Sequence, residues 1–342
     1  MDRGWRVGVI FGGESGEHDV SLMSASFVLR SIKEAGYEVV PIGITPDGCW
    51  LGPEASAEGL KNGSLKGIRT RELFDYQLLK GLDLVFPVLH GPMGEDGTLQ
   101  GLLEMMHLPY VGSGVLGSAM GMDKEMMKRS FAARGLPQAS YLVASYQQLD
   151  SGSESLKRKI REYFGYPCFV KPANMGSSVG ISRVSKESEL SSALREAAAH
   201  DDKLLVEEAV VGRELECSVL GGSELCVSVP GEVVPRRGFY DYQAKYGEGL
   251  TDLIIPARIR EDVKIEIRNL AVEAFRTIDA YGLARVDFFL SRENELLVNE
   301  INTMPGFTRY SMYPMLWRES GLQGPQLIER LLELAMEREE HK

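Results

Sequence analysis

Short apolar runs near the start of the chain alternate with longer amphipathic or polar stretches. Residues 6–11, 38–44 and 82–89 are rich in Val, Ile, Leu and Phe, and each run is short enough for a buried strand. Between them, Asp19 is the expected N-cap of a helix, and residues 46–66, rich in Gly, Ser and Glu, are expected to form a loop with little regular structure. Strands that alternate with helices predict a parallel sheet with crossover helices.

A different pattern begins at Met122, where a predicted helix over residues 123–134 leads into units of mixed strands and helices. The expected strands of the central part are residues 167–172, 179–184 and 203–210. The expected elements of the last part are several strands after residue 214, a loop over 238–256, a helix over 260–281, a strand pair at 284–290 and 296–301, and terminal helices. The pattern therefore predicts an α/β and α+β fold of three modules, residues 1–121, 122–213 and 214–342.

Composition agrees with a folded protein of several domains. The chain has 342 residues, 44% of them hydrophobic, which is enough for two or three packed domains. Charged residues make up 25%, an ordinary globular value that excludes disorder. The formal net charge of -11 argues against general binding to nucleic acid or to an anionic membrane. An anionic ligand would therefore need a local cluster of lysines and arginines.

The sequence contains no signal for a membrane or for an oxidising compartment. The four cysteines have no metal-type spacing and are expected to be reduced thiols: Cys49, Cys168, Cys217 and Cys226. The first apolar run is too short for a signal peptide, and no stretch approaches the roughly 20 apolar residues of a membrane span. We expect a soluble, cytoplasmic protein with no nucleic-acid and no membrane partner.

Residues 283–303 carry more chemical information than any other segment. Two apolar stretches flank the polar sequence SRENE, a pattern typical of a β-hairpin. We expect the turn to centre between Glu293 and Asn294. A shift of one residue would move every side chain of one strand to the opposite face of the sheet, so the register decides which residues meet.

In this register Asp287 lies opposite Glu300, and Arg285 lies opposite Asn302. Side chains two residues apart share a face, so all four are expected to point the same way. Two carboxylates and an amide oxygen are the hard ligands that hold Mg²⁺ when nucleotide phosphates complete its octahedron. Facing carboxylates in a half-buried sheet would otherwise cost several kcal/mol. The alternative is that Arg285 pairs with one carboxylate and the other groups are solvated.

A strand lysine followed by a loop of small residues forms a second candidate site. Lys171 ends an apolar strand, and residues 174–180 follow as a glycine- and serine-rich turn. The hydroxyls of Ser177 and Ser178 and nearby backbone N–H groups can close over phosphate oxygens, and the glycines permit a lid movement. Lys124 is a second candidate phosphate contact. The chain has no GxxxxGK[ST] motif, which excludes a P-loop enzyme.

Residues 112–117 fit the dinucleotide fingerprint GxGxxG, but the rest of that motif is absent. The acidic residue expected about 20 positions later is missing, since Leu136, Pro137 and Gln138 stand there. We therefore interpret the segment as a tight turn between a strand and a helix.

Six segments, in order along the chain, resemble the D-alanine–D-alanine ligases of the ATP-grasp superfamily. They are residues 11–21 (FGGESGEHDVS), 90–101 (HGPMGEDGTLQG), 110–114 with 122–124, 169–180, 239–246 (FYDYQAKY) and the hairpin continued through 299–308 (NEINTMPGFT). The resemblance implies an ATP-grasp fold with the nucleotide between the central and C-terminal modules. It also implies ATP-dependent formation of D-alanyl-D-alanine, through a D-alanyl phosphate, for peptidoglycan precursors.

The resemblance further implies how ATP and metal are bound. The implied ATP-binding residues are Lys124, Lys171, Ser177, Ser178, Glu207, Glu214 and Lys245. Without the resemblance, Glu207 and Glu214 would be interpreted as solvated charges. The implied ligands of two Mg²⁺ ions, or of Mn²⁺ in their place, are Asp287, Glu300 and Asn302.

The residues implied for substrates and chemistry come from all three modules. The implied catalytic residues are Glu17, Ser177, Tyr246, Arg285 and Gly306. Glu17 would bind the ammonium of the first D-alanine, held through Ser177 and Tyr246, while Arg285 and the Gly306 N–H would stabilise the oxyanion. The second D-alanine is expected at His90, Ser311 and Met312. A homodimer is expected from the resemblance alone.

Three alternatives remain open on the sequence. Another ATP-grasp ligase, using a different amino acid or a hydroxy acid, would keep the hairpin but differ at residues 239–246. A nicotinamide-dependent oxidoreductase built on residues 112–117 would bind NAD and give the paired carboxylates no role. A non-catalytic nucleotide sensor would have lost a competent residue, and every proposed position carries one.

Overall fold

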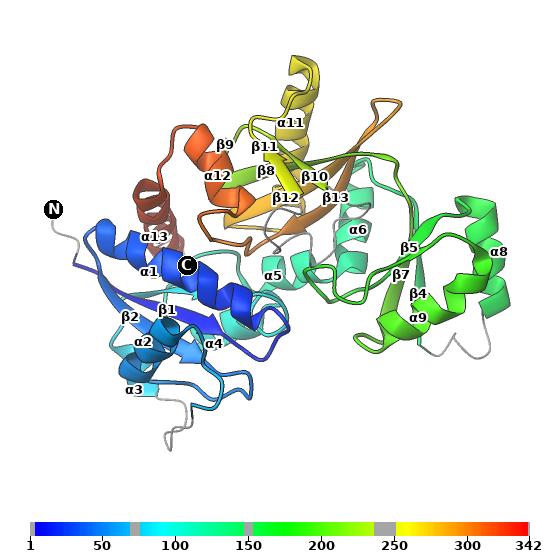
Figure 1. Ribbon diagram of the computed structural model, residues 1–342. Helices are drawn as coiled ribbons and strands as arrows, with labels where there is room; N and C mark the ends of the chain where they lie inside the picture. Colours follow the sequence, from blue (N-terminus) through cyan, green and yellow to red (C-terminus); the bar gives the residue numbers. More distant parts are fainter. Residues whose placement is uncertain (1–3, 69–75, 147–152, 236–250, 341–342) are drawn as a thin grey trace.

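In the part of the chain that the structure describes, the strands form three separate sheets. The computed structural model describes residues 4–68, 76–146, 153–235 and 251–340. The sheets contain three, four and six strands, and each has its own covering helices. In Figure 1 the three-stranded sheet lies at lower left, the six-stranded sheet in the centre and the four-stranded sheet at right.

The first sheet is parallel, as predicted, with the strand order β2-β1-β3. Its strands are β1 (Arg6–Gly12), β2 (Glu38–Ile44) and β3 (Leu84–Val88). Its principal helices are α1 (His18–Glu34), α2 (Pro53–Asn62), α3 (Tyr76–Lys80) and α4 (Thr98–Met105). Alternation along β1 buries both faces: Val7, Val9 and Phe11 belong to one apolar cluster and Ile10 to another.

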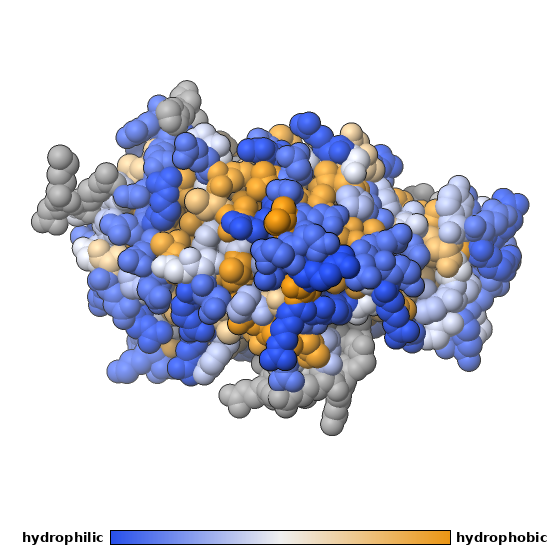
Figure 2. All heavy atoms as spheres, turned by 90° about the horizontal axis from the view of Figure 1, so that it is seen from above, coloured by the Kyte–Doolittle hydropathy of each residue, from blue (hydrophilic) through white to orange (hydrophobic). Residues whose placement is uncertain are grey.

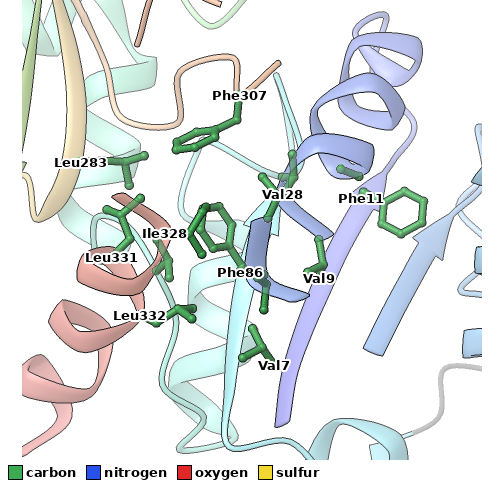
Figure 3. Packing of buried hydrophobic residues seen from close by; sticks show 14 of the residues in the cluster. Val7, Val9, Phe11, Val28, Phe86, Leu283, Phe307, Ile328, Leu331 and Leu332 are labelled. Atoms are coloured by element: carbon green, nitrogen blue, oxygen red, sulfur yellow. The ribbon is translucent and has the colours of Figure 1, made fainter. Parts of the chain in front are cut away.

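The C-terminal helices return to this first sheet. The helices are α12 (Met312–Glu319) and α13 (Gly324–Glu340), and α13 packs against α1. Figure 3 shows Ile328, Leu331 and Leu332 of α13 directed toward Phe86 and the strands of the first sheet. The ring of Phe307 lies 5.8 Å from that of Phe86. The two ends of the chain therefore share one hydrophobic core.

The second sheet is antiparallel and lies at the far end of the molecule. Its order is β4-β7-β5-β6, formed by β4 (Tyr141–Ser145), β5 (Cys168–Pro172), β6 (Ser182–Val184) and β7 (Lys203–Glu208). The helices α8 (Ser153–Tyr163) and α9 (Leu190–Ala198), the latter preceded by η1 (Glu187–Glu189), pack on one face. The outer surface of this end is largely hydrophilic in Figure 2, in keeping with the many charged residues of α8.

The third sheet contains the predicted hairpin. Its order is β11-β10-β8-β12-β13, with β9 beside β8. The strands are β8 (Gly212–Gly221), β9 (Leu225–Val227), β10 (Gly231–Pro235), β11 (Thr251–Ile254), β12 (Gly282–Ser291) and β13 (Leu296–Asn302). One face is covered by α11 (Glu261–Thr277) and by residues of α6 (Lys124–Ala133), which follows α5 (Val115–Met122).

Some local predictions were wrong. The first helix begins at His18 with Glu17 at the N-cap position, so Asp19 lies inside its first turn. The predicted loop over 46–66 contains α2, which starts with Pro53 and ends at the left-handed Gly63. The apolar pattern of α2 is hidden because Ser56 is buried and accepts a hydrogen bond from the Gly43 N–H at 2.7 Å.

Two strand predictions also needed correction. The strand predicted over 179–184 is confined to β6, because residues 177–180 form turns instead. The end of the loop predicted over 238–256 is the strand β11, which pairs antiparallel with β10. The part of that loop from residue 238 to 250 lies outside the described residues. None of the described helices is long and apolar enough to cross a membrane.

The shared core of α13 and the first sheet gives a stability prediction. Leu331 is fully buried, so Leu331→Ala should lower the free energy of unfolding of this unit by about 2–5 kcal/mol, because it removes apolar contacts and leaves a cavity. Urea denaturation measures the change. Ile265→Ala on α11, where the side chain is 55% exposed, is the control and should change the free energy by about 0.5 kcal/mol or less. Equal effects of the two substitutions would contradict the proposed docking.

Candidate functional site

The hairpin brings the four predicted polar residues onto one face of the third sheet. Asp287 pairs with Glu300, and Arg285 pairs with Asn302, as predicted. Because directly opposite residues point to the same side of a sheet, the two carboxylates, the amide and the guanidinium share that face. The opposite face of β12 is apolar and buried, with Val286 in the core beneath α11.

The two strands of the hairpin adopt this pairing because β13 contains a β-bulge. On the turn side, Phe288 pairs with Val298, so the turn centres on Glu293 and the predicted turn centre was wrong by half a residue. A shift of register between Asp287 and Phe288 leaves Asn299 as the extra residue of β13. The bulge restores the predicted pairing at the polar end, and it re-aims the side chains there.

A third strand adds a carboxylate that sequence reasoning missed. β8 pairs with the other edge of β12 and places Glu216 directly opposite Asp287. Glu216 is buried, with 5% of its surface exposed. The signal was the alternation of β8, in which Glu214, Glu216 and Ser218 alternate with the core residues Leu215, Cys217 and Val219. What remained hidden was that β8 is the neighbour of β12.

Arg285 pairs with two of the three carboxylates on this face. Its Nε and one terminal nitrogen each donate to Asp287 at 2.7 Å, and Nε lies 3.0 Å from Glu216. Asn302 Nδ2 donates to Asp287 Oδ2 at 3.1 Å. The alternative of an Arg285–Asp287 pair is therefore realised in this structure.

The donor set fits a divalent cation that takes further ligands from a nucleotide. Asp287, Glu300 and Asn302 supply hard oxygen atoms, which Mg²⁺ prefers. Among the described residues, no three His, Cys, Asp or Glu side chains gather closely enough to hold a metal ion by themselves. Such an ion would therefore need phosphate oxygens or water as well. It would also require the Arg285 guanidinium to turn away from Asp287.

A cavity of about 340 Å³ separates this face from the second sheet. Its lining includes Asp287 and Glu300 from the third sheet and Lys171 and Glu207 from the second. Glu214 and Ser178 also line it. These predicted nucleotide-binding and metal-binding residues therefore line a common space, although Lys171 and Glu300 are 129 positions apart.

Two lysines hold Glu207 in the wall of this cavity. Lys171 Nζ lies 2.5 Å from Glu207 Oε2, and Lys128 Nζ lies 3.1 Å from Oε1. Burial opposes the charge of Glu207, but the two lysines outweigh it and lower the pKa of the carboxyl below its ordinary value. Burial lowers the pKa of Lys128. The interpretation of Glu207 as a solvated charge is thus wrong.

Lys128 was not among the predicted site residues, although the sequence carried a signal for it. Lys124, Met127, Lys128 and Phe131 follow the spacing i, i+3, i+4, i+7, which places them on one helix stripe. Met127 and Phe131 are fully buried. A lysine on an apolar stripe is unusual, and that was the available clue.

Lys124 joins the first turn of α6 to the glycine loop. Its Nζ donates to the Met175 carbonyl at 2.6 Å, and the residue is 7% exposed. A smaller cavity of about 50 Å³ is lined by Lys124, Ser177, Glu300 and Asn302, among others. The predicted phosphate contact and the predicted metal ligands are therefore neighbours.

The glycine loop closes onto Glu17 of the first module. Ser177 donates a hydrogen bond to the Glu17 carboxylate, as predicted. Ser177 and Ser178 both have left-handed backbone conformations, with φ of 45° and 59°, which non-glycine residues rarely adopt. A Cβ at Gly176 would lie 2.7 Å from Glu17 Oε2, so the glycine permits this close approach.

His90 is buried beside Glu17 and pairs with a carboxylate that was not predicted. Its Nε2 lies 3.1 Å from Ser24 Oγ and its Nδ1 lies 3.4 Å from Glu95 Oε1. Burial disfavours the imidazolium, but the hydrogen bond and charge of Glu95 and the charge of Glu17 raise the pKa of His90 above its ordinary value. Burial in turn raises the pKa of Glu95. The negative charges of Glu95 and Glu17 therefore favour the protonated imidazole of His90.

The remaining predicted residues are distributed around this centre. Ser311 Oγ accepts the Thr308 N–H at 3.0 Å and adjoins Gly306, whereas Met312 is buried against Val233. The contacts given by the described residues link Ser311 to Gly306 but not to His90. The predicted positions Lys245 and Tyr246 lie outside the described residues.

The segment that fits GxGxxG connects a strand-like residue to a helix, as interpreted. Tyr110 forms a parallel bridge with Val85, and α5 begins at Val115 with Gly114 as its N-cap. The segment packs against the start of β12, where Leu283 lies 3.5 Å from the position of a Cβ at Gly112.

Comparisons with known proteins agree over nearly the whole chain. Two family models match, "D-ala D-ala ligase N-terminus" over residues 6–113 and "D-ala D-ala ligase C-terminus" over residues 131–333. The D-alanine–D-alanine ligase of Halothermothrix orenii is 52% identical over 337 residues, which cover 97% of this chain and 98% of that protein. That of Geobacillus thermodenitrificans is 47% identical over 352 residues, covering 98% and 97%.

Solved structures resemble the whole chain as well. The VanG D-Ala:D-Ser ligase from Enterococcus faecalis has a TM-score of 0.84 and 34% identity, and the match covers 97% of this chain and 100% of that one. The D-alanine–D-alanine ligase from Coxiella burnetii also has a TM-score of 0.84 and 34% identity, with 98% and 95% covered.

The acidic face gives a prediction about Mg²⁺ in the absence of nucleotide. Arg285→Met leaves Asp287 and Glu216 without the guanidinium that contacts them, so the Tm should fall, and millimolar Mg²⁺ should recover part of the loss. Differential scanning calorimetry with and without Mg²⁺ measures both effects.

Arg213→Met is the matched control for this experiment. Arg213 lies on β8 and makes a bidentate pair with the single carboxylate of Glu232. Its loss should lower the Tm without recovery by Mg²⁺. Recovery of both variants, or of neither, would contradict a cation site on the Asp287 face.

Proposed function

Because this chain belongs to the D-alanine–D-alanine ligase family, we propose that the cavity between its second and third sheets is the ATP site. The enzyme joins two D-alanines into D-alanyl-D-alanine for peptidoglycan synthesis, with ATP as co-substrate and D-alanyl phosphate as intermediate. The observation that supports the site is the cavity itself, in which Lys171 and Arg183 of the second sheet and Asp287 and Glu300 of the third line a common space. Cationic and acidic walls of this kind suit a phosphate chain with its metal ions.

In the proposed complex, the nucleotide lies along the second sheet. Lys171 and Lys124 contact its phosphates, and Ser177 and Ser178 with the loop backbone cover them. Glu207 and Glu214 bind the adenosine end. These roles are supported by the burial of Lys124, Lys171 and Glu207 around the two cavities. Lys245 is proposed to reach the γ-phosphate, in keeping with its place in the matched motif.

Asp287, Glu300 and Asn302 are proposed to hold the divalent metal, two Mg²⁺ ions or Mn²⁺ in their place. When bound, the metal neutralises phosphate charge and favours departure of ADP. The proposal is supported by the shared strand face and by the oxygen donors found there. The Arg285 guanidinium is proposed to leave Asp287 and to contact either the transferring phosphoryl group or the developing oxyanion. A guanidinium suits this role because its donors match phosphate and carboxylate oxygens.

The first D-alanine is proposed to bind with its ammonium at Glu17. Ser177 holds the Glu17 carboxylate by a hydrogen bond, and Tyr246 is proposed to complete this link. A carboxylate oxygen of the D-alanine attacks the γ-phosphorus of ATP, the bond to the β-phosphate bridging oxygen breaks, and ADP leaves. The product is D-alanyl phosphate, which must be kept from water because it hydrolyses readily.

The second D-alanine is proposed to bind between His90 and Ser311, with the backbone near Met312 at its carboxylate. Its free amine attacks the acyl carbon, and inorganic phosphate leaves from the tetrahedral intermediate. The Gly306 N–H and Arg285 stabilise the oxyanion of that intermediate. A proton lost by the amine during attack can be taken up by the His90–Glu95 pair or by the departing phosphate.

We also propose the three modules 1–121, 122–213 and 214–342 as the units that move around the substrates. Core packing supports separate units, although α6 packs into the third sheet and α13 onto the first. A homodimer and a cytoplasmic location remain expectations. The free state of all four cysteines favours a reducing compartment.

Removal of a proposed metal ligand tests the site directly. Glu300→Gln should lower kcat for D-alanyl-D-alanine formation by about 100-fold or more, because a neutral amide cannot balance the metal charge near the transferring phosphate. Phosphate release and dipeptide are measured with ATP, Mg²⁺ and D-alanine. Glu295→Gln in the exposed hairpin turn is the control and should retain activity. A Glu300→Gln enzyme with half of the normal rate would refute the assignment.

The contact between Gly176 and Glu17 gives a prediction for the first substrate. In Gly176→Ala the new Cβ would displace the Glu17 carboxylate, so the KM for the first D-alanine should rise by about ten-fold with little change in the Tm. Initial rates over a range of D-alanine concentrations separate the two substrate sites. Gly101→Ala, where a Cβ meets nothing within 4 Å, is the control and should leave the KM unchanged. An unchanged KM in Gly176→Ala would exclude Glu17 as the ammonium site.

A further inference from the structure

Lys128 lies behind the proposed ATP site and has no part in the reaction described above. The residue is 0% exposed, whereas Lys171, its neighbour across Glu207, lines the cavity. Each lysine contacts a different oxygen of the Glu207 carboxylate, Lys128 at 3.1 Å and Lys171 at 2.5 Å. Fully buried lysines are rare because desolvation of the ammonium is costly, so this one calls for an explanation.

The position of Lys128 links two of the sheets. On α6, Met127 and Phe131 pack into the core of the third sheet. From the same helix stripe, Lys128 reaches β7 of the second sheet, where Glu207 stands. The Lys128 carbonyl also accepts a hydrogen bond from Gln138 Nε2 at 2.8 Å, in the segment that leads into β4. The ion pair thus lies where the chain crosses between the sheets that enclose the cavity.

The Glu207 carboxylate would keep one cationic partner if one of its two lysines moved away from it. The carboxylate is 3% exposed and has two ammonium partners, one more than neutrality requires. If Lys171 moves toward a nucleotide phosphate, Glu207 would lose one cation and would be an unbalanced buried charge without the other. Lys128 has no access to solvent and cannot follow the nucleotide. It therefore stays as the partner of Glu207 in either state.

We propose that Lys128 is a positioning residue that keeps Glu207 ionised and in place while Lys171 is transferred to a nucleotide phosphate. The inference rests on the ATP site proposed above and adds a residue that does not touch the nucleotide. Other groups close to Lys128 agree with a fixed cation. Its Nζ lies 5.6 Å from the centre of the Tyr141 ring, and the charges of Glu207 and Glu300 oppose the lowering of its pKa by burial.

The proposal predicts a selective loss of ATP affinity. In Lys128→Met, transfer of Lys171 would leave Glu207 unbalanced, so the Kd for ATP measured by titration calorimetry should rise by about ten-fold. The KM for D-alanine should change by less than about two-fold, because Glu17 and Ser177 do not contact this ion cluster. Lys186→Met, which removes a lysine that is 71% exposed, is the control and should leave both values unchanged. If Lys128 had a purely structural role, Lys128→Met would lower the Tm without raising the Kd for ATP more than the KM for D-alanine.

A double-mutant cycle with Glu207→Gln tests whether Lys128 acts through Glu207. When the carboxylate is already an amide, removal of Lys128 should change the Kd for ATP by less than about two-fold. The double variant removes both buried charges, so it and Glu207→Gln give an answer even if Lys128→Met does not fold. A ten-fold effect of Lys128→Met in the Glu207→Gln background would overturn the proposal. Equal changes in the Kd for ATP and in the KM for D-alanine would also overturn it.

The same measurements distinguish failure of this inference from failure of the ATP site. If the unaltered enzyme binds ATP but Lys171→Met leaves its Kd unchanged, the proposed phosphate contact is wrong. If Lys171→Met weakens ATP binding and Lys128→Met does not, the site stands and the role of Lys128 is refuted.

Discussion

The structure depends on how negative charge is balanced on half-buried strands. Asp287, Glu216 and Glu300 meet on one face of the third sheet because β8, β12 and β13 are neighbours in this register. Carboxylates in such a place are costly unless cations accompany them. Arg285 fills that need in the structure described here, through contacts with Asp287 and Glu216. In the proposed function, the same need favours a divalent ion there once nucleotide phosphates are bound.

The opposite wall of the cavity balances a buried carboxylate in the same way. Lys171 of the second sheet and Lys128 of α6 both contact Glu207. Strand alternation produces both walls, since each sheet buries its apolar face under helices and turns its polar face to the cavity. In the proposed complex, the phosphates of ATP and their metal complete both walls.

Much of this could be predicted from the sequence, because periodicity and motif order carry the information. The parallel first sheet and the pairing of Asp287 with Glu300 follow from apolar alternation and a recognisable turn. The bulge at Asn299 could not be predicted, because it depends on how β13 fits its neighbour. Glu216 was missed because strand order within a sheet is not written in local sequence. The helix α2 was hidden because it packs through small residues such as Ser56.

Lys128 illustrates a different limit of sequence reasoning. Its place on a buried helix stripe was visible, but its partner is 79 positions away on another sheet. Only the crossing of α6 between the sheets shows that a lysine there can neutralise a carboxylate in the cavity wall. The residues predicted from the family motifs are those that are proposed to touch substrates. The residues that hold them in place emerged from burial and distance.

The central claim is that a metal and nucleotide phosphates replace Arg285 as the partners of Asp287. A crystal structure with Mg²⁺ and a non-hydrolysable ATP analogue tests it most directly. We expect a metal ion at about 2.0–2.1 Å from oxygens of Asp287, Glu300 and Asn302, with the guanidinium turned from Asp287 to the phosphate. An intact Arg285–Asp287 pair beside bound nucleotide, with no metal between the carboxylates and the phosphates, would contradict the account.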